Sequence, residues 1–306
     1  MANIQRVRTI TEFHRTRQLP APQHPLISVV DYAQINMMPE YLDSSWTFDF
    51  YFISLKRNFS AKIKYGQQSY DFDEGVMFFF GPGQVFKVDR HPGTSEGRSG
   101  WMLLIHPDFI WGTSLSKLIK QYDFFGYKIN EALFVSNREE VTMMGIIENI
   151  TREYNANIDK FSQNIIISQI ETLLNYSERF YNRQFLTRKK ANHQILERME
   201  VILTDYFNGD ALIGKGLPTV AYLGEILCVS PKYLSSLVSS LTGQSALQHI
   251  HDKLIEKAKE KLSVTQLSVG EVAYALGFEH PQSFSKFFKS KMSVSPLEFR
   301  RSFNNN

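Results

Sequence analysis

The sequence contains a single cysteine, Cys228, among its 306 residues, so no disulfide can form within the chain. A chain without disulfides suits a reducing compartment, and we expect it in the cytoplasm. No run of about 18 apolar residues occurs, which is the length that a membrane-spanning helix needs. The first residues, MANIQRVRTITEFHRTRQ, are charged and lack the apolar core of a secretory signal. We therefore expect no membrane partner.

The sequence also lacks the patterns of common catalytic and metal sites. Gly81, Pro82 and Gly83 favour a turn at a strand end, and no glycine-rich phosphate loop is present. The strand-rich region contains only His91 and His106, without a His-x-His pair, whereas a metal site needs three or more converging ligands. No Ser-His-Asp arrangement stands out. We predict no enzyme activity, no metal and no cofactor.

The composition is that of a folded chain with two domains. Its hydrophobic fraction of 43% and aromatic fraction of 13% provide packed cores. Its length suggests two domains at roughly 100–200 residues each. A net charge of +3 permits a nucleic-acid partner without arguing for one.

The first 110 residues are rich in short strand patterns separated by turn residues. Such strands at close spacing predict a small antiparallel β-barrel or sandwich. The patterns are WTFDFYFISL (46–55), FSAKIKYG (59–66), SYDF (69–72), VMFFF (76–80), GPGQVFKV (81–88) and GWMLLIHPDFI (100–110).

Aromatic side chains alternate along the first of these strands and share one face. Core packing is the favoured interpretation, and the alternative is that they line a ligand pocket. The candidate ligand-binding residues are Trp46, Phe48, Phe50, Lys64 and Trp101.

Two amphipathic helices are predicted after the strands, as a hairpin over about 137–185. In the first, Asn137 serves as N-cap and Glu140 completes a capping box, with Val141, Met144, Ile147 and Ile150 on one face. The second runs from 161 to 185. The hairpin either covers the barrel or pairs through an outer stripe with a second copy of the chain.

A segment rich in Arg and Lys, RQFLTRKKANHQ (183–194), follows the hairpin and has few apolar residues. It favours a linker, although a solvated helix end has the same composition. We predict a domain over 1–185, a linker over 186–194 and a second domain over 195–306.

The second domain is predicted to be helical and contains a repeat. The segments SPKYLSSLVSS (230–240) and HPQSFSKFFKS (280–290) align at an offset of 50 residues, with apolar positions in common. Each follows a shorter helical pattern, which predicts helix-turn-helix units at about 219–241 and 269–292. Their tight turns need a small residue and a residue that tolerates positive φ. Gly224 and Cys228 fill these positions in the first unit, and Ala273 and Gly277 in the second.

Two segments of this domain resemble the AraC family of bacterial regulators. They are VSPKYLSSLVSSLTGQSALQHIHDKLIEKAKEKL (229–262) and LSVGEVAYALGFEHPQSFSKFFKSKMSVSPLEFRR (267–301). The resemblance implies an α+β chain: a cupin-like N-terminal barrel that senses a ligand and pairs in dimers, then two helix-turn-helix units.

By this resemblance, the second helix of each unit enters the major groove of DNA. The base-reading positions carry over as Lys232, Ser235 and Ser236 in the first unit, and Pro281, Gln282, Ser283 and Lys286 in the second. An aromatic–lysine pair common in the family is present as Phe288 and Lys289, where Lys289 would contact DNA. Val238 and Ser239 replace this pair in the first unit, which puts phosphate anchoring there in doubt.

The charge distribution favours the second unit for binding strength. Basic residues exceed acidic ones by four over 257–306, whereas acidic residues exceed basic ones by three over 195–256. Phosphate contacts provide much of the affinity for DNA, so the second unit is expected to contribute more.

The resulting hypothesis is a sequence-specific transcription regulator that binds double-stranded DNA as a homodimer. It responds to a small-molecule effector through its barrel and contacts RNA polymerase. The alternatives are a cupin-type enzyme with an unrelated helical tail and a structural DNA-binding protein without a ligand.

Overall fold

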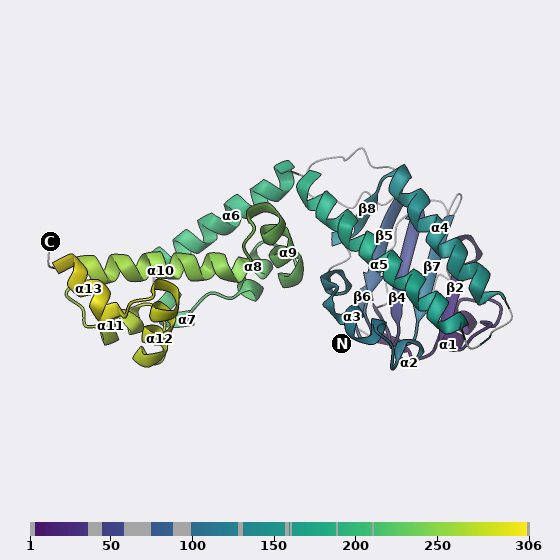
Figure 1. Ribbon diagram of the computed structural model, residues 1–306, viewed down its shortest axis with the longest axis horizontal. Helices are drawn as coiled ribbons and strands as arrows, with labels where there is room; N and C mark the ends of the chain where they lie inside the picture. The colour runs from purple at the N-terminus through teal and green to yellow at the C-terminus, as the bar shows by residue number, and fades with distance from the viewer. Residues whose placement is uncertain are drawn as a thin grey trace. The chain divides into compact units, whose positions relative to one another are not determined.

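The computed structural model describes residues 4–35, 45–57, 75–87, 99–127, 131–156, 159, 161–187, 189–209 and 211–304 (Figure 1). The chain divides into two compact units, Met1–Thr187 and Arg188–Asn306, here called unit 1 and unit 2. The strands predicted at 59–66 and 69–72 lie outside the described residues.

The described strands of unit 1 form two hydrogen-bonded sheets. The larger sheet has the order β2-β7-β4-β5-β8, and all its neighbours are antiparallel. In the smaller sheet, β3 pairs with β1 in parallel and with β6 antiparallel. The bounds are β1 Ile4–Val7, β2 Ile27–Asp31, β3 Ser45–Phe48, β4 Tyr51–Arg57, β5 Gly75–Phe80, β6 Val85–Lys87, β7 Ser99–Ile105 and β8 Leu133–Val135. Among the described residues this is a two-sheet arrangement, with no ladder that closes it into a barrel.

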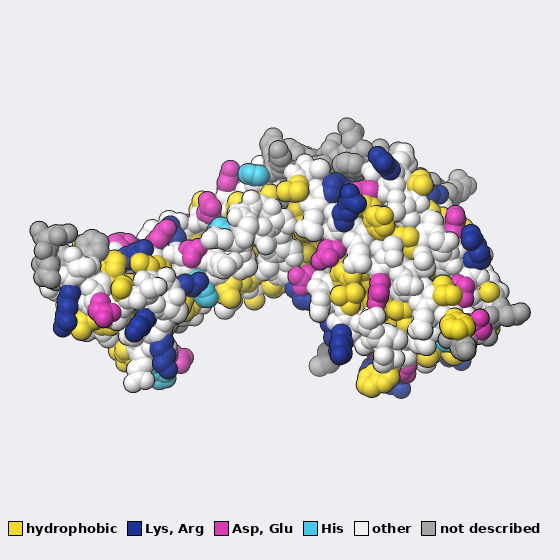
Figure 2. Space-filling model, viewed as in Figure 1, with side chains coloured by type: hydrophobic (Ala, Val, Ile, Leu, Met, Phe, Trp, Pro, Cys, Tyr) yellow, Lys and Arg dark blue, Asp and Glu magenta, His cyan; other side chains and the backbone are white. Residues whose placement is uncertain are grey.

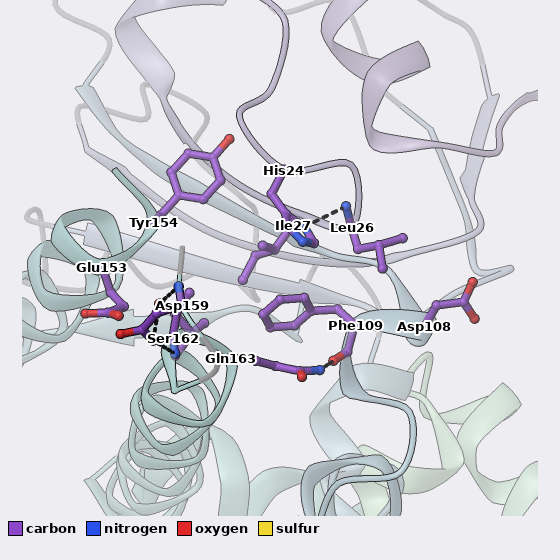
Figure 3. Close-up of a pocket in the computed structure, with 11 residues that line it drawn as sticks. His24, Leu26, Ile27, Asp108, Phe109, Glu153, Tyr154, Asp159, Ser162 and Gln163 are labelled. Carbon is purple, nitrogen blue, oxygen red and sulfur yellow. Dashed lines mark hydrogen bonds between the residues drawn. The ribbon is translucent and has the colours of Figure 1, made fainter. Parts of the chain in front are cut away.

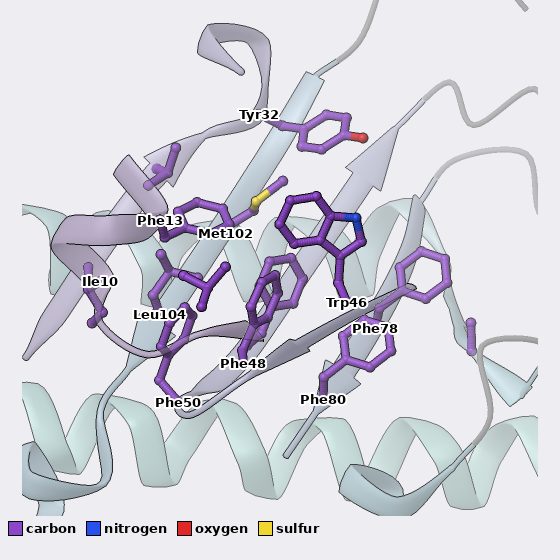
Figure 4. Close-up of a cluster of buried hydrophobic side chains, with 14 of the residues drawn as sticks. Ile10, Phe13, Tyr32, Trp46, Phe48, Phe50, Phe78, Phe80, Met102 and Leu104 are labelled. Atoms are coloured by element: carbon purple, nitrogen blue, oxygen red, sulfur yellow. The ribbon is translucent and has the colours of Figure 1, made fainter. Parts of the chain in front are cut away.

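Aromatic side chains from both sheets meet in one buried core (Figure 4). The rings of Phe48 and Phe50 stack at 5.0 Å, and Phe52 contacts Phe80 at 5.6 Å. The prediction of one strand over 46–55 is wrong, because the chain bends at residues 49–50 and passes from β3 in one sheet to β4 in the other. The bend is held by Asp49, whose carboxylate pairs with Arg6.

Two long helices, α4 (Asn137–Tyr154) and α5 (Ser162–Thr187), pack together and cover one face of the larger sheet (Figure 1). The predicted cap of α4 is wrong by one residue: Ser136 is the N-cap, and its reciprocal partner is Glu139. Val141, predicted on the packing face, is 72% exposed. Ile147 and Ile150 are buried as predicted, and Met143 and Ile146 complete the packing face.

Short helices complete unit 1. They are α1 Ile10–Thr16, η1 Tyr32–Gln34, α2 Pro107–Ile110, α3 Leu115–Leu118, η3 Ile119–Gln121 and η4 Asp123–Gly126.

Unit 2 is helical, and α10 contacts α6, α9, α11 and α13. The buried stripe of α10 includes Ala246, Ile250, Leu254, Ala258 and Leu262, and Leu247 is half-exposed. The predicted linker, 186–194, is helical where it is described, because α5 extends to Thr187 and α6 begins at Lys189. The bounds are α6 Lys189–Asn208, α7 Ala211–Lys215, α8 Val220–Ile226, α9 Pro231–Thr242, α10 Ala246–Val264, α11 Val269–Ala275, α12 Pro281–Met292 and α13 Pro296–Asn304.

Candidate nucleic-acid interface

Unit 2 contains two helix pairs, α8–α9 and α11–α12, whose turns have the same construction. In the first turn, the amide of Val229 donates to the carbonyl of Gly224 over 2.9 Å. In the second, the amide of Phe278 donates to the carbonyl of Ala273 over 3.0 Å. Each bond spans five residues and closes the end of the first helix, as in a Schellman motif. The two turns are therefore repeats of one local structure.

The residues predicted to permit these turns occupy the positions that need them. Cys228 has φ 61° and Gly277 has φ 80°, both in the left-handed region. A β-carbon on Gly224 would lie 2.8 Å from the carbonyl oxygen of Val229, so this helix position accepts no side chain without a shift of the backbone. Ala273, the corresponding residue of the second pair, is fully buried.

Because cysteine replaces glycine at a left-handed position, Cys228→Gly is expected to stabilise unit 2 by up to about 1 kcal/mol. Relief of roughly 1–2 kcal/mol of backbone strain is partly offset by about 0.4–1 kcal/mol from the greater freedom of the unfolded chain. Chemical denaturation followed by circular dichroism measures the change. Cys228→Ala is the matched control, because it removes an exposed thiol and keeps the strain. Equal stability of the two variants would contradict the strain at this turn.

The second helix of each pair begins on a proline at its first helical position, Pro231 in α9 and Pro281 in α12. Ser230 caps α9 by accepting a hydrogen bond from the amide of Tyr233. The loop before α12 is one residue longer, and the side chain of its N-cap residue His280 makes no capping hydrogen bond. The offset between the repeats accordingly grows from 49 residues at the turn to 50 in the second helix.

Apolar residues attach these helices to unit 2 and leave polar ones outside. In α9 the buried residues are Tyr233, Leu234, Leu237 and Val238, and in α12 they are Phe284 and Phe288. Of the predicted DNA-contacting residues, Lys232, Gln282, Ser283, Lys286 and Lys289 are exposed, and Ser235, Ser236 and Pro281 are half-buried. Their role in reading bases stays a prediction.

The basic residues of unit 2 divide into exposed and engaged groups. Lys257 donates to Asn208 and Glu260, and the guanidinium of Arg300 donates to the carbonyl of Leu262 near the end of α10. Exposed basic residues are found on α12 and α13, where Lys and Arg side chains gather in Figure 2. Of the two helix pairs, the second therefore presents more exposed positive charge, with Lys286, Lys289 and Lys291 on α12 against Lys232 on α9.

The candidate ligand-binding residues of unit 1 are placed in its interior. Trp46, Phe48 and Phe50 belong to the aromatic core, and Trp101 is buried. Lys64 lies outside the described residues. Core packing, the favoured interpretation, accounts for Trp46, Phe48 and Phe50. A ligand-binding role for these residues stays a prediction.

The structure gives no metal site among the residues that it describes, since no three His, Cys, Asp or Glu side chains gather there. His106 instead caps α2 by accepting a hydrogen bond from the amide of Asp108, and His91 lies outside the described residues. Within the same described residues, no helix is long and apolar enough to cross a membrane.

Comparison with known proteins agrees with this geometry. Residues 223–302 match the family model described as a helix-turn-helix domain. The arabinose operon regulatory protein of Salmonella typhimurium is 25% identical over 229 residues, which is 74% of this chain and 74% of that protein. This match is longer than unit 2 and therefore extends into unit 1.

Two further relatives match within a shorter stretch. The transcriptional regulatory protein YesN of Bacillus subtilis is 33% identical over 79 residues, covering 25% of this chain and 22% of that protein. The solved C-terminal domain of AraT, a response regulator from Geobacillus stearothermophilus, is 31% identical, with a TM-score of 0.32, and covers 35% of this chain and 84% of that domain. Unit 2 therefore contains a match to a helix-turn-helix domain, and the chain is similar to AraC-type DNA-binding transcription regulators.

Proposed function

We propose that this chain is a sequence-specific transcription regulator in which α8–α9 and α11–α12 are two helix-turn-helix units. The observation that carries the proposal is the repeated turn, which presents two helices with buried apolar stripes and polar outer positions. Helices of this kind insert into the major groove, where their side chains contact base edges. In this proposal α9 and α12 read successive major-groove segments, about 34 Å apart along one face of the duplex.

The side chains of α12 suit base recognition. The amide of Gln282 matches both hydrogen-bonding groups of adenine in the major groove, and the ammonium of Lys286 donates to the acceptors of guanine. Lys289, farther along the same helix, suits a phosphate contact. In α9, Lys232 provides one long donor, while Ser235 and Ser236 provide short and less selective ones.

Unit 1 is proposed as a cupin-like sensor and pairing domain. Exposed apolar side chains on or beside α4 and α5, among them Val141, Phe161 and Ile165, support a homodimer formed through these helices. A dimer would present four helix-turn-helix units. A small-molecule effector acting through unit 1, and contact with RNA polymerase, complete the proposal.

Affinity for DNA measured against salt concentration tests the proposal. We expect the logarithm of the binding constant to fall linearly with the logarithm of the salt concentration. Each phosphate that the protein neutralises should add roughly 0.9 to the steepness of this slope. Full-length protein and a library of duplexes, separated by gel shift, supply the measurement. A binding constant that does not change with salt would contradict DNA binding through Lys286, Lys289 and their neighbours.

A further inference from the structure

A cavity of about 340 Å³ lies in unit 1 beside the end of α4 and the start of α5 (Figure 3). Its walls come from four segments far apart in the sequence: the approach to β2, α2, the last turn of α4 and the first turn of α5. Its volume falls within the range of small-molecule sites. None of its lining residues belongs to the aromatic core between the two sheets, so it is a different place from the predicted ligand pocket.

Hydrogen bonds between distant segments hold these walls in place. The hydroxyl of Tyr154, in α4, accepts from the amide of Gln23 over 2.7 Å. The side-chain amide of Gln163, in α5, donates to the carbonyl of Phe109, in α2, over 2.6 Å. The end of α4 and the start of α5 are thus each tied to a neighbouring segment, and the cavity is preformed rather than a gap between independent parts.

The lining combines an apolar floor with negative charge. Ile27, Phe109 and Ile166 are at most 5% exposed and give the floor its apolar surface. The charged side chains at its edge are carboxylates, from Asp108, Glu153 and Asp159, and the described lining contains no Lys or Arg.

The protonation states of Asp159 and His24 keep the lining negatively charged. The pKa of Asp159 is lowered, chiefly because the backbone amide of Phe161 donates to its carboxylate, and so it stays ionised at neutral pH. Burial lowers the pKa of His24, whose Nδ1 accepts from the amide of Leu26. His24 is therefore neutral at neutral pH and contributes no positive charge, while its ring meets Phe109 edge to face at 5.6 Å.

We propose that this cavity binds a small organic cation, an amine attached to an apolar body. The ammonium group would lie beside the carboxylates of Glu153 and Asp159, and the apolar body would cover Phe109 and Ile166. An anion of the same shape would meet three carboxylates without a compensating cation. The site does not depend on DNA binding, so it can fail or succeed independently of the proposed function.

Isothermal titration calorimetry of the full chain tests the site, with 2-phenylethylamine and hexylamine as cationic probes and phenylacetate as the anionic counterpart. We expect both amines to bind and phenylacetate not to bind. Glu153→Gln should weaken amine binding about tenfold, because it removes a charged hydrogen-bond acceptor. The matched control is Glu148→Gln, on the exposed side of the same helix and away from the cavity, and it should bind like the unaltered chain.

A second variant removes the space instead of the charge. Leu26→Trp, at a half-buried position in the wall, should abolish amine binding while the thermal unfolding temperature of the free protein stays close to its original value. No heat from either amine at millimolar concentration would overturn the proposal. So would binding of phenylacetate, or equal affinity of Glu153→Gln and the unaltered chain.

Discussion

Gly277→Ala is expected to lower the free energy of unfolding of unit 2 by about 2–4 kcal/mol. Gly277 has φ 80°, a conformation that costs an alanine roughly 1–2 kcal/mol. The new β-carbon would also lie 2.9 Å from the carbonyl oxygen of Leu212 and 3.2 Å from the Cα of Gly216. Both neighbours are backbone atoms, so no side chain can rotate away, and the backbone of α7 and of Gly216 after it has to move.

Two other glycines of unit 2 separate these contributions. Gly243 has φ 75° with nothing within 4 Å of its would-be β-carbon, so Gly243→Ala should show the conformational cost alone, roughly 1–2 kcal/mol. Gly224 has helical backbone angles and a β-carbon position 2.8 Å from a carbonyl oxygen, so Gly224→Ala should show the contact cost alone. That cost is about 1–3 kcal/mol, reduced by up to about 1 kcal/mol for the better helix propensity of alanine.

Denaturation followed by two probes assigns the loss to the correct unit. All three tryptophans, Trp46, Trp101 and Trp111, belong to unit 1, so their fluorescence reports that unit, whereas helical circular dichroism also reports unit 2. The Gly277→Ala transition should shift in circular dichroism and stay in place in fluorescence. A loss no greater than that of Gly243→Ala would show that the close approach to Leu212 has no energetic consequence.

The turns of unit 2 could be predicted because their requirements are local. A residue at positive φ, a small residue in the preceding helix and a proline at the start of the next helix can each be read from a few neighbouring letters. Cys228 and Gly277 occupy the predicted places, and Pro231 and Pro281 are the first residues of the helices that follow.

The start of α4 could not be predicted as well, because two registers satisfy the same local rule. Ser136 and Asn137 are both good caps, and each is followed three residues later by a glutamate. Tertiary contacts decide between them: Glu140 is buried in an ion pair with Arg57 of β4, while Glu139 closes the capping box and also pairs with Arg183 of α5. Neither arginine is a sequence neighbour of the helix start.

The alternation of apolar residues also did not indicate where one strand ends and the next begins. Phe48, Phe50 and Phe52 keep their alternation through the bend, since all three enter the same core, from β3, the bend and β4 respectively. The cavity beside α5 is further from prediction, because its lining residues come from segments as distant as His24 and Ile166. Apolar alternation and capping patterns depend on residues that are neighbours along the chain. Neither pattern indicates which segments pack against each other in the folded protein.

Gln282→Ala and Lys286→Ala are each expected to relax the preference for one or two base pairs, with a loss of about 1–3 kcal/mol of discrimination. Both side chains are exposed on α12, whereas the buried Phe284 and Phe288 fix the helix in unit 2. Removal of these two side chains therefore leaves the fold intact and changes only the polar groups that α12 offers to DNA. Selection of bound duplexes from a random pool, followed by sequencing, measures the preference of each variant.

Two lysine variants distinguish base reading from charge. Lys289→Ala should weaken binding to every duplex alike and lower the salt dependence by about one phosphate contact, with the preferred sequence unchanged. Lys253→Ala removes the same charge from α10, where Lys253 pairs with Glu256, and should alter neither affinity nor preference. An unchanged preference in both Gln282→Ala and Lys286→Ala would show that α12 is not the helix that reads the bases, because the same exposed positions would then contact no base edge.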